Sequence, residues 1–305
     1  MTVPKVSIII PTYKRSQKIA RAVKSAISQK YENFEIIVVD DNDPTDVERS
    51  NTENVMKQFE KNENVSYIKH SRNMNGSAAR NTGINHSTGM YVTFLDDDDE
   101  YFPDKIKKQV DVLESLDDSW GICYSGYEKI DRNNYTSYSA EVAEGDVIVQ
   151  ALSKNFFIGS GSNYMVRKKI VEELKGFDET FKRNQDLEFL VRVVSKYKIK
   201  YVDERLFLIH EDENPKRFTY DEIVGVYEQY RQKFGKYIES LSVEEKNNVL
   251  KVLDLSDLRL AVTYKQYKDV LNIFKGSNLS LMDVFKYVKY LATRLITKKS
   301  YGFRL

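Results

Sequence analysis

Apolar and polar positions alternate in blocks over residues 1–115. A short continuous apolar run, typical of a strand buried on both faces, lies at residues 6–10, and a second buried strand is expected at 34–40. Two more strands are expected at 65–70 and 90–95. Segments expected to be helical follow these strands, at residues 16–29, 47–61, 77–87 and 103–115. The alternation of strands with helices predicts an α/β fold, in which right-handed crossovers build a mostly parallel, doubly wound sheet with helices on both faces.

The pattern changes after residue 120. Further strands are expected at 120–130, 162–169 and 201–210, with a polar excursion or hairpin before residue 146 and a helix within 176–197. From about residue 216 onward, the chain has only helical patterns rich in Lys and Tyr. We therefore expect an α/β domain over residues 1–215 and a C-terminal helical extension over residues 216–305.

The composition narrows the class of protein. The chain has 305 residues, 41% apolar and 30% charged, and its net charge of +1 gives no indication of a nucleic-acid partner. Cys123 is the single cysteine, so no internal disulfide is expected and a reducing compartment is favoured. No apolar run approaches the roughly 18 residues of a membrane span, and the apolar part of the N-terminus is too short for a secretory signal. We expect a cytoplasmic protein.

Polar clusters follow three of the expected strands. They are Pro11-Thr12-Tyr13, Asp40-Asp41 and Asp96–Asp99. Ligands of open parallel sheets bind at the carboxyl ends of the strands, so these clusters are candidates for one binding site.

The aspartate run Asp96–Asp99 raises a specific question, because adjacent carboxylates repel one another unless positive charge lies among them. One interpretation is a solvated acidic loop before the next helix. The other is a divalent cation site, because Mg²⁺ and Mn²⁺ prefer hard oxygen ligands and often bind one or two carboxylates together with substrate phosphates. The position at the binding edge of a parallel sheet favours the cation.

Other candidate residues also have two interpretations. Asp40 and Asp41 either shape a turn, for which DNDPTD is a typical composition, or accept hydrogen bonds from a ribose or a base N–H. Asp186 is either a carboxylate that interacts with a helix dipole or a general base. His210 is either an ordinary residue at a strand end or a ligand of phosphate or metal.

The motifs VSIIIPTYKR, IIVVDDNDPTD, NGSAARNTGI, YVTFLDDDDEYFPDKI, GFDE and RNQD occur in this order. Together they resemble the family 2 glycosyltransferases, the large inverting class with the GT-A fold, of the type that builds bacterial surface polysaccharides. The resemblance covers roughly residues 5–215. It implies a nucleoside diphosphate sugar as donor, most often UDP-linked, Mn²⁺ or Mg²⁺ as cofactor, and a glycan or lipid-linked acceptor.

The same resemblance implies a role for each candidate residue. The nucleotide pocket would include Pro11, Thr12, Tyr13, Asp40, Asp41, Arg80, Asn81, Asp96 and Asp97, with Asp41 at the base and Asp97 near the ribose. Asp98 would bind the metal, for which His210 is a second candidate ligand, and Asp186 would be the catalytic base. The family usually has an acidic residue before the base, whereas this chain has Gln185, which removes a charge that would raise the pKa of Asp186.

Two other classes of protein fit the pattern less well. A receiver-type signalling domain has an acidic Mg²⁺ pocket, but its acidic pair ends the first strand, which here ends in Pro11-Thr12. A sugar nucleotidyltransferase is expected to have a Gly-rich loop after that strand, and PTYKRSQ has no glycine. No G-x-G-x-x-G motif follows the strand either, which disfavours a Rossmann dinucleotide site.

The segment 281–299 predicts an amphipathic helix with a basic face. Its apolar positions are Leu281, Val284, Phe285, Val288, Leu291, Ala292, Leu295 and Ile296, and its basic residues are Lys286, Lys289, Arg294, Lys298 and Lys299. Two interpretations are open: the helix packs on the rest of the protein, or it lies on an anionic membrane surface and brings the enzyme to a lipid-linked acceptor.

Overall fold

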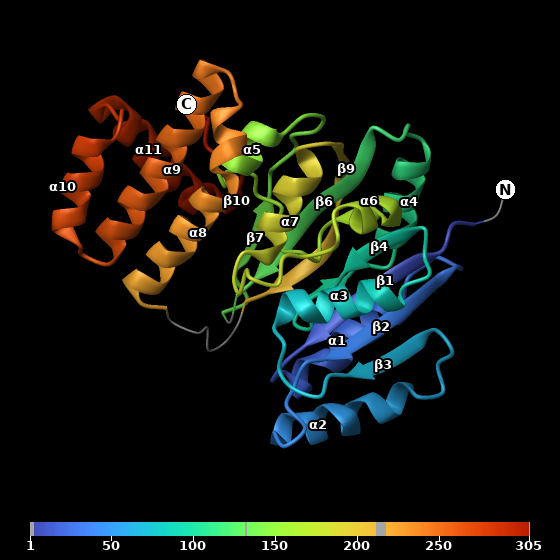
Figure 1. Ribbon diagram of the computed structural model, residues 1–305. Coiled ribbons are helices and arrows are strands. Elements are labelled where there is room, and N and C mark those ends of the chain that lie inside the picture. The colour runs from blue at the N-terminus through green and yellow to red at the C-terminus, as the bar shows by residue number, and fades with distance from the viewer. Residues whose placement is uncertain (1–2, 132, 212–217, 305) are drawn as a thin grey trace. The chain divides into compact units, whose positions relative to one another are not determined.

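The structure is a computed structural model that describes residues 3–131, 133–211 and 218–304, and the chain divides into two compact units (Figure 1). The first unit comprises Met1–Asp146 and Ile158–Asp212, and the second comprises Val147–Phe157 and Glu213–Leu305. The expected domain boundary near residue 215 lies outside the described residues. The sequence pattern did not predict that Val147–Phe157 belongs with the C-terminal helices.

The first unit is built around one sheet. Its strands are β1 (Val6–Thr12), β2 (Phe34–Asp40), β3 (Val65–Lys69), β4 (Tyr91–Phe94), β5 (Glu100–Tyr101), β6 (Trp120–Ile130), β7 (Thr136–Ser139), β8 (Met165–Arg167) and β9 (Lys198–His210). The main strand order in this unit is β7-β6-β8-β4-β1-β2-β3, and β9 pairs with β5 and β6. The four N-terminal strands are parallel, as predicted. Beyond β4 the sheet is mixed, because β8 is antiparallel to both β4 and β6, whereas β9 is parallel to β6.

Helices cover both faces of the parallel strands. The helices of this unit are α1 (Ser16–Ile27), α2 (Val47–Met56), the 3₁₀ turn η1 (Lys57–Phe59), α3 (Gly76–His86), α4 (Lys105–Glu114), α6 (Lys168–Glu173) and α7 (Gln185–Val194). Because side chains of a strand alternate between faces, Ile8 and Ile10 pack in one cluster with α1 and α4, while Ile37 and Val39 pack against α3. Gly83 of α3 lies so close to β1 that a Cβ there would be 2.4 Å from Ile9 Cγ2.

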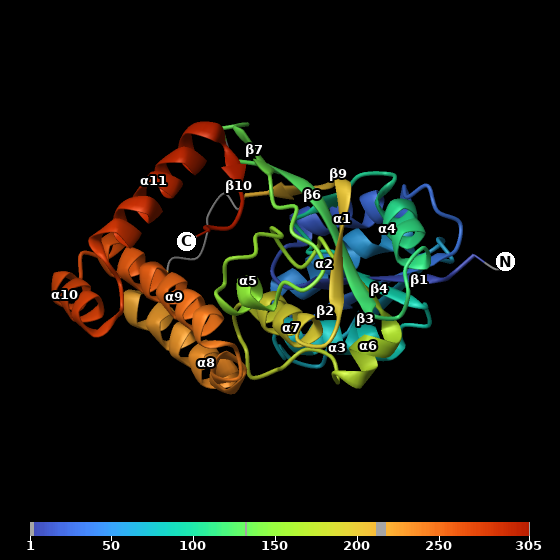
Figure 2. The same ribbon diagram turned by 90° about the horizontal axis from the view of Figure 1, so that it is seen from above.

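The second unit is helical (Figure 2). Its elements are α5 (Ile148–Leu152), α8 (Tyr220–Glu239), α9 (Val243–Thr263), α10 (Tyr267–Gly276), α11 (Leu281–Thr297) and the short strand β10 (Lys299–Ser300). Capping boxes at Thr219, Ser242 and Ser280 begin α8, α9 and α11. The Tyr230 hydroxyl donates to the carbonyl oxygens of Ala151 and Leu152, at 3.0 and 3.2 Å, which joins α8 to α5.

Helix α11 has two apolar sides. Tyr287 is buried in a cluster with Val252, Leu255 and Phe303, and the partly buried Leu291 packs on this cluster. The opposite side leaves large apolar side chains exposed, namely Leu281, Met282, Phe285, Val288, Leu295 and Ile296. In the part of the chain that the structure describes, no helix is long and apolar enough to span a membrane.

Candidate active site

The carboxyl ends of β1 and β4 meet through side chains of the first unit. The Thr12 hydroxyl donates to Asp97 Oδ2 at 2.7 Å, and the Tyr13 backbone N–H approaches the same oxygen at 3.4 Å. The parallel register that pairs Ile9 with Phe94 brings these two strand ends together. Pro11 lies at the same end of β1, half-buried, and the Tyr13 side chain is exposed there. The structure therefore brings the first and third predicted clusters into one site.

The four aspartates after β4 have separate partners. Asp96 pairs with Arg80 at 2.5 Å, Asp97 and Asp98 both pair with Arg15, at 3.0 and 2.8 Å, and Asp99 accepts hydrogen bonds from Ser160 and Ser162. The Asp99 backbone N–H also donates to Asp96 O at 3.0 Å, which closes a tight turn. Arginines and serines therefore supply the positive charge and the donors that the run needs. Arg15 was not among the predicted site residues, although it follows Tyr13 and Lys14 in the motif PTYKR.

The carboxyl of Asp98 has an unusual environment. Burial, and then the negative charge of Asp97, raise its pKa to about 7, against a smaller opposing effect of Arg15. A second arginine, Arg21, donates to the backbone oxygen of Asp98 at 2.6 Å and leaves the carboxylate oxygens to Arg15. A cation bound at Asp98 would favour its ionised form, as would the arginine.

Arg80 links the aspartate run to the expected base. Besides Asp96, its guanidinium donates to Gln185 Oε1 at 2.9 Å, and Gln185 is the first residue of α7. Asp186 follows in the first turn of that helix. Burial, and then the charge of Asp96, raise the pKa of Asp186, while Arg80 opposes the shift. The structure thus brings Asp186 into the same electrostatic neighbourhood as Asp96.

A buried tyrosine next to Asp186 was not predicted. The Tyr164 side chain is fully buried, and among the described residues its hydroxyl has no hydrogen-bond partner. Burial, and then the charge of Asp186, raise the pKa of Tyr164. A buried hydroxyl without a partner is costly, so this atom is suited to bind a ligand or a water molecule. The sequence gives no signal for it, because SNYM reads only as part of a strand.

The second cluster has a largely structural arrangement. Asp40 is completely buried, and its carboxylate accepts from Asn42 N, Asn42 Nδ2 and the Tyr67 hydroxyl and pairs with Arg49. Asp41 accepts from Met74 N at 2.7 Å and contacts His70 Nδ1 at 2.7 Å. Burial raises the pKa of Asp41, against these hydrogen bonds. Asp40 therefore shapes the turn after β2, and Asp41 fixes the segment that leads to α3.

Asn81 and His210 form hydrogen bonds with residues outside the aspartate run. Asn81 donates to Phe177 O at 2.9 Å and accepts from Phe177 N at 2.7 Å, so its side chain holds the GFDE loop and not the aspartate run. His210 contacts Glu100 at 3.3 Å, and burial and the charge of Arg21 lower its pKa. In the described part of the chain, no three His, Cys, Asp or Glu side chains gather as a metal site.

The model of the family described as Glycosyl transferase family 2 matches residues 7–175, more than half of the chain. The chain belongs to this glycosyltransferase family. The matched region contains β1 to β4 and the aspartate run. The prediction of the family and of a transferase enzyme is confirmed.

Similar proteins in other organisms are also glycosyltransferases. An uncharacterized glycosyltransferase of Rickettsia felis is 30% identical over 71% of this chain, and a β-1,3-glucosyltransferase of Campylobacter jejuni, named for the substrate GalNAc(5)-diNAcBac-PP-undecaprenol, is 31% identical over 68% of the chain and 63% of its own length. The amylovoran biosynthesis glycosyltransferase AmsB of Erwinia amylovora is 29% identical over 64% of the chain and 65% of its own length. The chain spans only 36% and 34% of the length of the Rickettsia felis and Rickettsia bellii relatives.

Solved glycosyltransferase structures share the fold. S. aureus TarS, in complex with UDP-GlcNAc, matches 85% of this chain and 73% of its own with a TM-score of 0.65 at 17% identity. The mannosyltransferase PcManGT from Pyrobaculum calidifontis, in complex with GDP-Man and Mn²⁺, matches 96% of this chain and 81% of its own with a TM-score of 0.59 at 18% identity. The expected GT-A fold with C-terminal helices is confirmed.

Proposed function

We propose that this glycosyltransferase transfers a hexosyl or N-acetylhexosaminyl group from a nucleoside diphosphate sugar, with UDP as the favoured nucleotide, to a hydroxyl of a glycan or lipid-linked acceptor, with inversion at the anomeric carbon. The observation that carries this proposal is the connection of the aspartate run to Asp186 through Asp96, Arg80 and Gln185. It joins the edge of the sheet that would bind the diphosphate to a half-buried carboxylate with a raised pKa.

The donor nucleotide would occupy the ends of β1, β2 and β4. Pro11, Thr12 and Tyr13 would line its pocket, with the exposed Tyr13 ring available for stacking on the base. Asp41 would accept from the base and Asp97 would lie near the ribose. The complexes of TarS with UDP-GlcNAc and of PcManGT with GDP-Man support a nucleotide-sugar donor. Asp40 and Asn81 would hold the surrounding loops and not the nucleotide.

The donor set fits a divalent cation that is bound mainly through the substrate. Asp98 is a carboxylate whose pKa is raised by burial and by the charge of Asp97. Burial and the charge of Arg21 lower the pKa of the half-buried His210. Without three gathered side-chain ligands in the described residues, Asp98 and the donor diphosphate would hold Mn²⁺ or Mg²⁺, with His210 as a candidate second ligand. The ion would neutralise charge on the departing diphosphate. The Mn²⁺ complex of PcManGT supports such a cofactor.

Asp186 would act as the general base. It would take the proton of the acceptor hydroxyl while that oxygen attacks the anomeric carbon opposite the diphosphate, through an oxocarbenium-like transition state. The raised pKa of Asp186 brings its basicity closer to that required near neutral pH. Arg15, which pairs with two of the aspartates, would stabilise the negative charge of the leaving diphosphate.

The acceptor would belong to the synthesis of a cell-surface polysaccharide on the cytoplasmic side of the membrane. Names of two relatives support this class, namely the amylovoran enzyme and the glucosyltransferase that acts on an undecaprenol-linked substrate. The exposed apolar side of α11, with Lys286 and Lys289 beside it, would contact the anionic membrane surface. Arg294 does not belong to this basic face, because it is half-buried and stacks on Phe157.

Hydrolysis of a panel of sugar nucleotides, with Mn²⁺, Mg²⁺ or EDTA, tests the proposal. One UDP-sugar should be hydrolysed slowly without acceptor, and EDTA should abolish the reaction. Absence of hydrolysis for every donor, together with absence of UDP binding by calorimetry, would contradict the proposal.

A further inference from the structure

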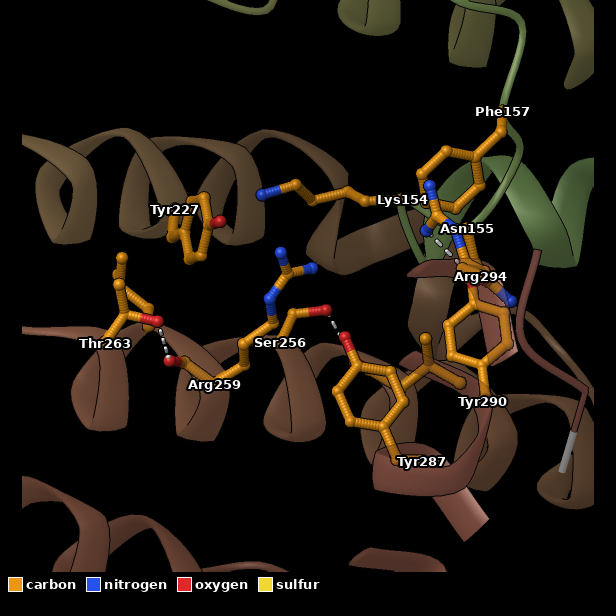
Figure 3. A pocket seen from close by; sticks show the side chains of 12 residues that line it. Lys154, Asn155, Phe157, Tyr227, Ser256, Arg259, Thr263, Tyr287, Tyr290 and Arg294 are labelled. Carbon is orange, nitrogen blue, oxygen red and sulfur yellow. Dashed lines mark hydrogen bonds between the residues drawn. The ribbon is translucent and has the colours of Figure 1, made fainter. Parts of the chain in front are cut away.

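A pocket of about 340 Å³ lies within the second unit (Figure 3). It is near the lower end of the range of small-molecule sites, about 300–1,000 Å³. Its walls come from α8, α9, α11 and the segment Lys154–Phe157. Asn155 fixes one wall, because its side chain donates to Phe303 O and accepts from Phe303 N. The pocket therefore has a defined frame of its own.

The charge in this pocket has one sign. Lys154, Arg259 and Arg294 line it, and no carboxylate is among its described lining residues. The two aspartates of the same stretch of α9, Asp254 and Asp257, pair with Arg231, at 3.2 and 2.5 Å. Three cations that line one concave site produce a positive potential that attracts an anion, since the nearby aspartates are paired with Arg231.

The three cations differ in their contacts with other side chains. Lys154 Nζ lies 3.2 Å from the centroid of the Tyr227 ring, and Arg294 stacks on Phe157 at 4.2 Å and donates to the Tyr290 hydroxyl. The Arg259 guanidinium, in contrast, makes no hydrogen bond or ion pair with any described residue. Figure 3 shows that Lys154 and Arg259 extend toward the same space, next to Tyr227.

Aromatic rings complete the lining. Tyr227, Tyr287 and Tyr290 line the pocket (Figure 3). Lys154 covers one face of the Tyr227 ring, and the Tyr290 hydroxyl accepts from Arg294 and donates to Tyr301 O. Such rings offer apolar area for the C–H face of a sugar. The guanidinium of Arg259 can bind a carboxylate or a phosphate with two parallel hydrogen bonds.

We infer that this pocket binds an acidic sugar, with its carboxylate or phosphate on Arg259 and Lys154 and its ring against the tyrosines. The choice of a carbohydrate rests on the proposed function, whereas the charge and the rings are properties of the pocket. An acceptor chain that carries an acidic sugar would thus be held by a site of the second unit that is separate from the aspartate run.

Calorimetric titration of the full chain tests this inference. The ligands are glucuronate, glucose 6-phosphate, glucose and inorganic phosphate, each titrated without donor. Both acidic sugars should bind more tightly than glucose and inorganic phosphate, and their affinity should fall with added salt. Equal binding of glucose and glucuronate would overturn the inference, and so would equal binding of inorganic phosphate and glucose 6-phosphate.

Variants separate this pocket from the donor site. Arg259→Gln should weaken glucuronate binding about tenfold or more, since hydrogen bonds to charged groups are lost, and should leave UDP binding unchanged. Lys268→Gln, at an exposed lysine outside the pocket, is the matched control. Asp98→Asn should leave glucuronate binding unchanged. Equal losses of glucuronate affinity in Arg259→Gln and Lys268→Gln would overturn the inference. If the wild type does not bind UDP, that result would contradict only the proposed function.

Discussion

Arg80 donates to Gln185 Oε1 at 2.9 Å, and Gln185 immediately precedes Asp186 at the start of α7. Arg80 thereby lies between the carboxylate of Asp96 and the expected base. A glutamate at position 185 would accept from Arg80 as well, but would add a negative charge next to Asp186. We expect Gln185→Glu to raise the pKa of Asp186 and to move the acidic limb of the kcat/KM profile to higher pH by roughly 0.5–1 unit.

Gln185→Met is the matched control for this prediction, because it removes the hydrogen bond without adding charge. The acidic limb of its pH profile should stay where it is in the wild type. An unchanged limb in Gln185→Glu would mean that the limb reports a group other than Asp186.

Asp186→Asn should separate donor binding from transfer. The variant should bind UDP as the wild type does, and kcat should fall by about 10²–10⁴, the usual contribution of a general base. Calorimetry with UDP measures the first quantity and product formation the second. Lost UDP binding in a folded variant would assign Asp186 to the donor site or to the structure.

Asp98→Asn should stabilise the enzyme in the absence of metal and nucleotide. Because the pKa of Asp98 is raised to about 7, the native state holds a proton that the unfolded chain has already released, and the free energy of unfolding of the wild type falls as pH rises from about 4 to about 7. Urea unfolding near pH 8 should show a gain of about 1–4 kcal/mol for the variant, and near pH 4 the gain should vanish.

Metal gives this prediction a second readout. Mn²⁺ with UDP should raise the Tm of the wild type and should raise that of Asp98→Asn much less. When Mn²⁺ is added to metal-free enzyme, turnover should return only in the wild type. Equal metal stabilisation of both proteins would exclude Asp98 as the ligand.

Tyr67→Phe should destabilise the first unit and leave the contacts of the aspartate run unchanged. The Tyr67 hydroxyl donates to the buried carboxylate of Asp40, and hydrogen bonds to charged groups contribute about 1.5–3 kcal/mol. We expect a loss of that size in chemical unfolding. Tyr267→Phe, at an exposed ring, should change the free energy of unfolding by less than about 0.5 kcal/mol. A loss no larger than that of the control would contradict a role of Tyr67 in the turn after β2.

The exposed side of α11 predicts binding to anionic liposomes. Sedimentation of the full chain should require anionic lipid and should decrease with added salt, since each basic residue near the surface contributes about 1 kcal/mol. Phe285→Ser with Leu295→Ser should abolish capture, because both side chains are exposed in the wild type. Tyr267→Ser with Leu271→Ser, on exposed positions of α10, is the control. If the wild type stays in the supernatant at low salt, α11 does not contact the membrane.

The strands and helices of the first unit could be predicted from the pattern of apolar and polar residues along the chain. The run at 34–40 coincides with β2, since burial on both faces requires mostly apolar residues, and the segment at 120–130 coincides with β6. The strand ends then indicated where the candidate site lies, because parallel strands end at one edge of the sheet.

The partners of the charged residues could not be predicted. Arg15 pairs with Asp97 and Asp98, which lie more than 80 positions further along the chain, and no local pattern encodes such a contact. The same holds for Arg294, which sequence periodicity assigns to a basic face but which turns onto Phe157. The tertiary arrangement determines which Arg and Lys side chains contact an aromatic ring or a carboxylate.

The segment Val147–Phe157 has a consequence for how the enzyme can be divided. The chain crosses between the two units at three places in the sequence, so one cut near residue 215 does not separate them. A fragment that ends near residue 215 would keep α5 but would lose Tyr230 and Phe303. The Tyr230 hydroxyl donates to Ala151 O, and the Phe303 backbone forms hydrogen bonds with the Asn155 side chain. Leu152 and Phe156, buried in the intact protein, would be left without much of their covering. A truncated catalytic fragment should therefore aggregate in solution. A fragment that folds on its own would need a loop in place of residues 147–157.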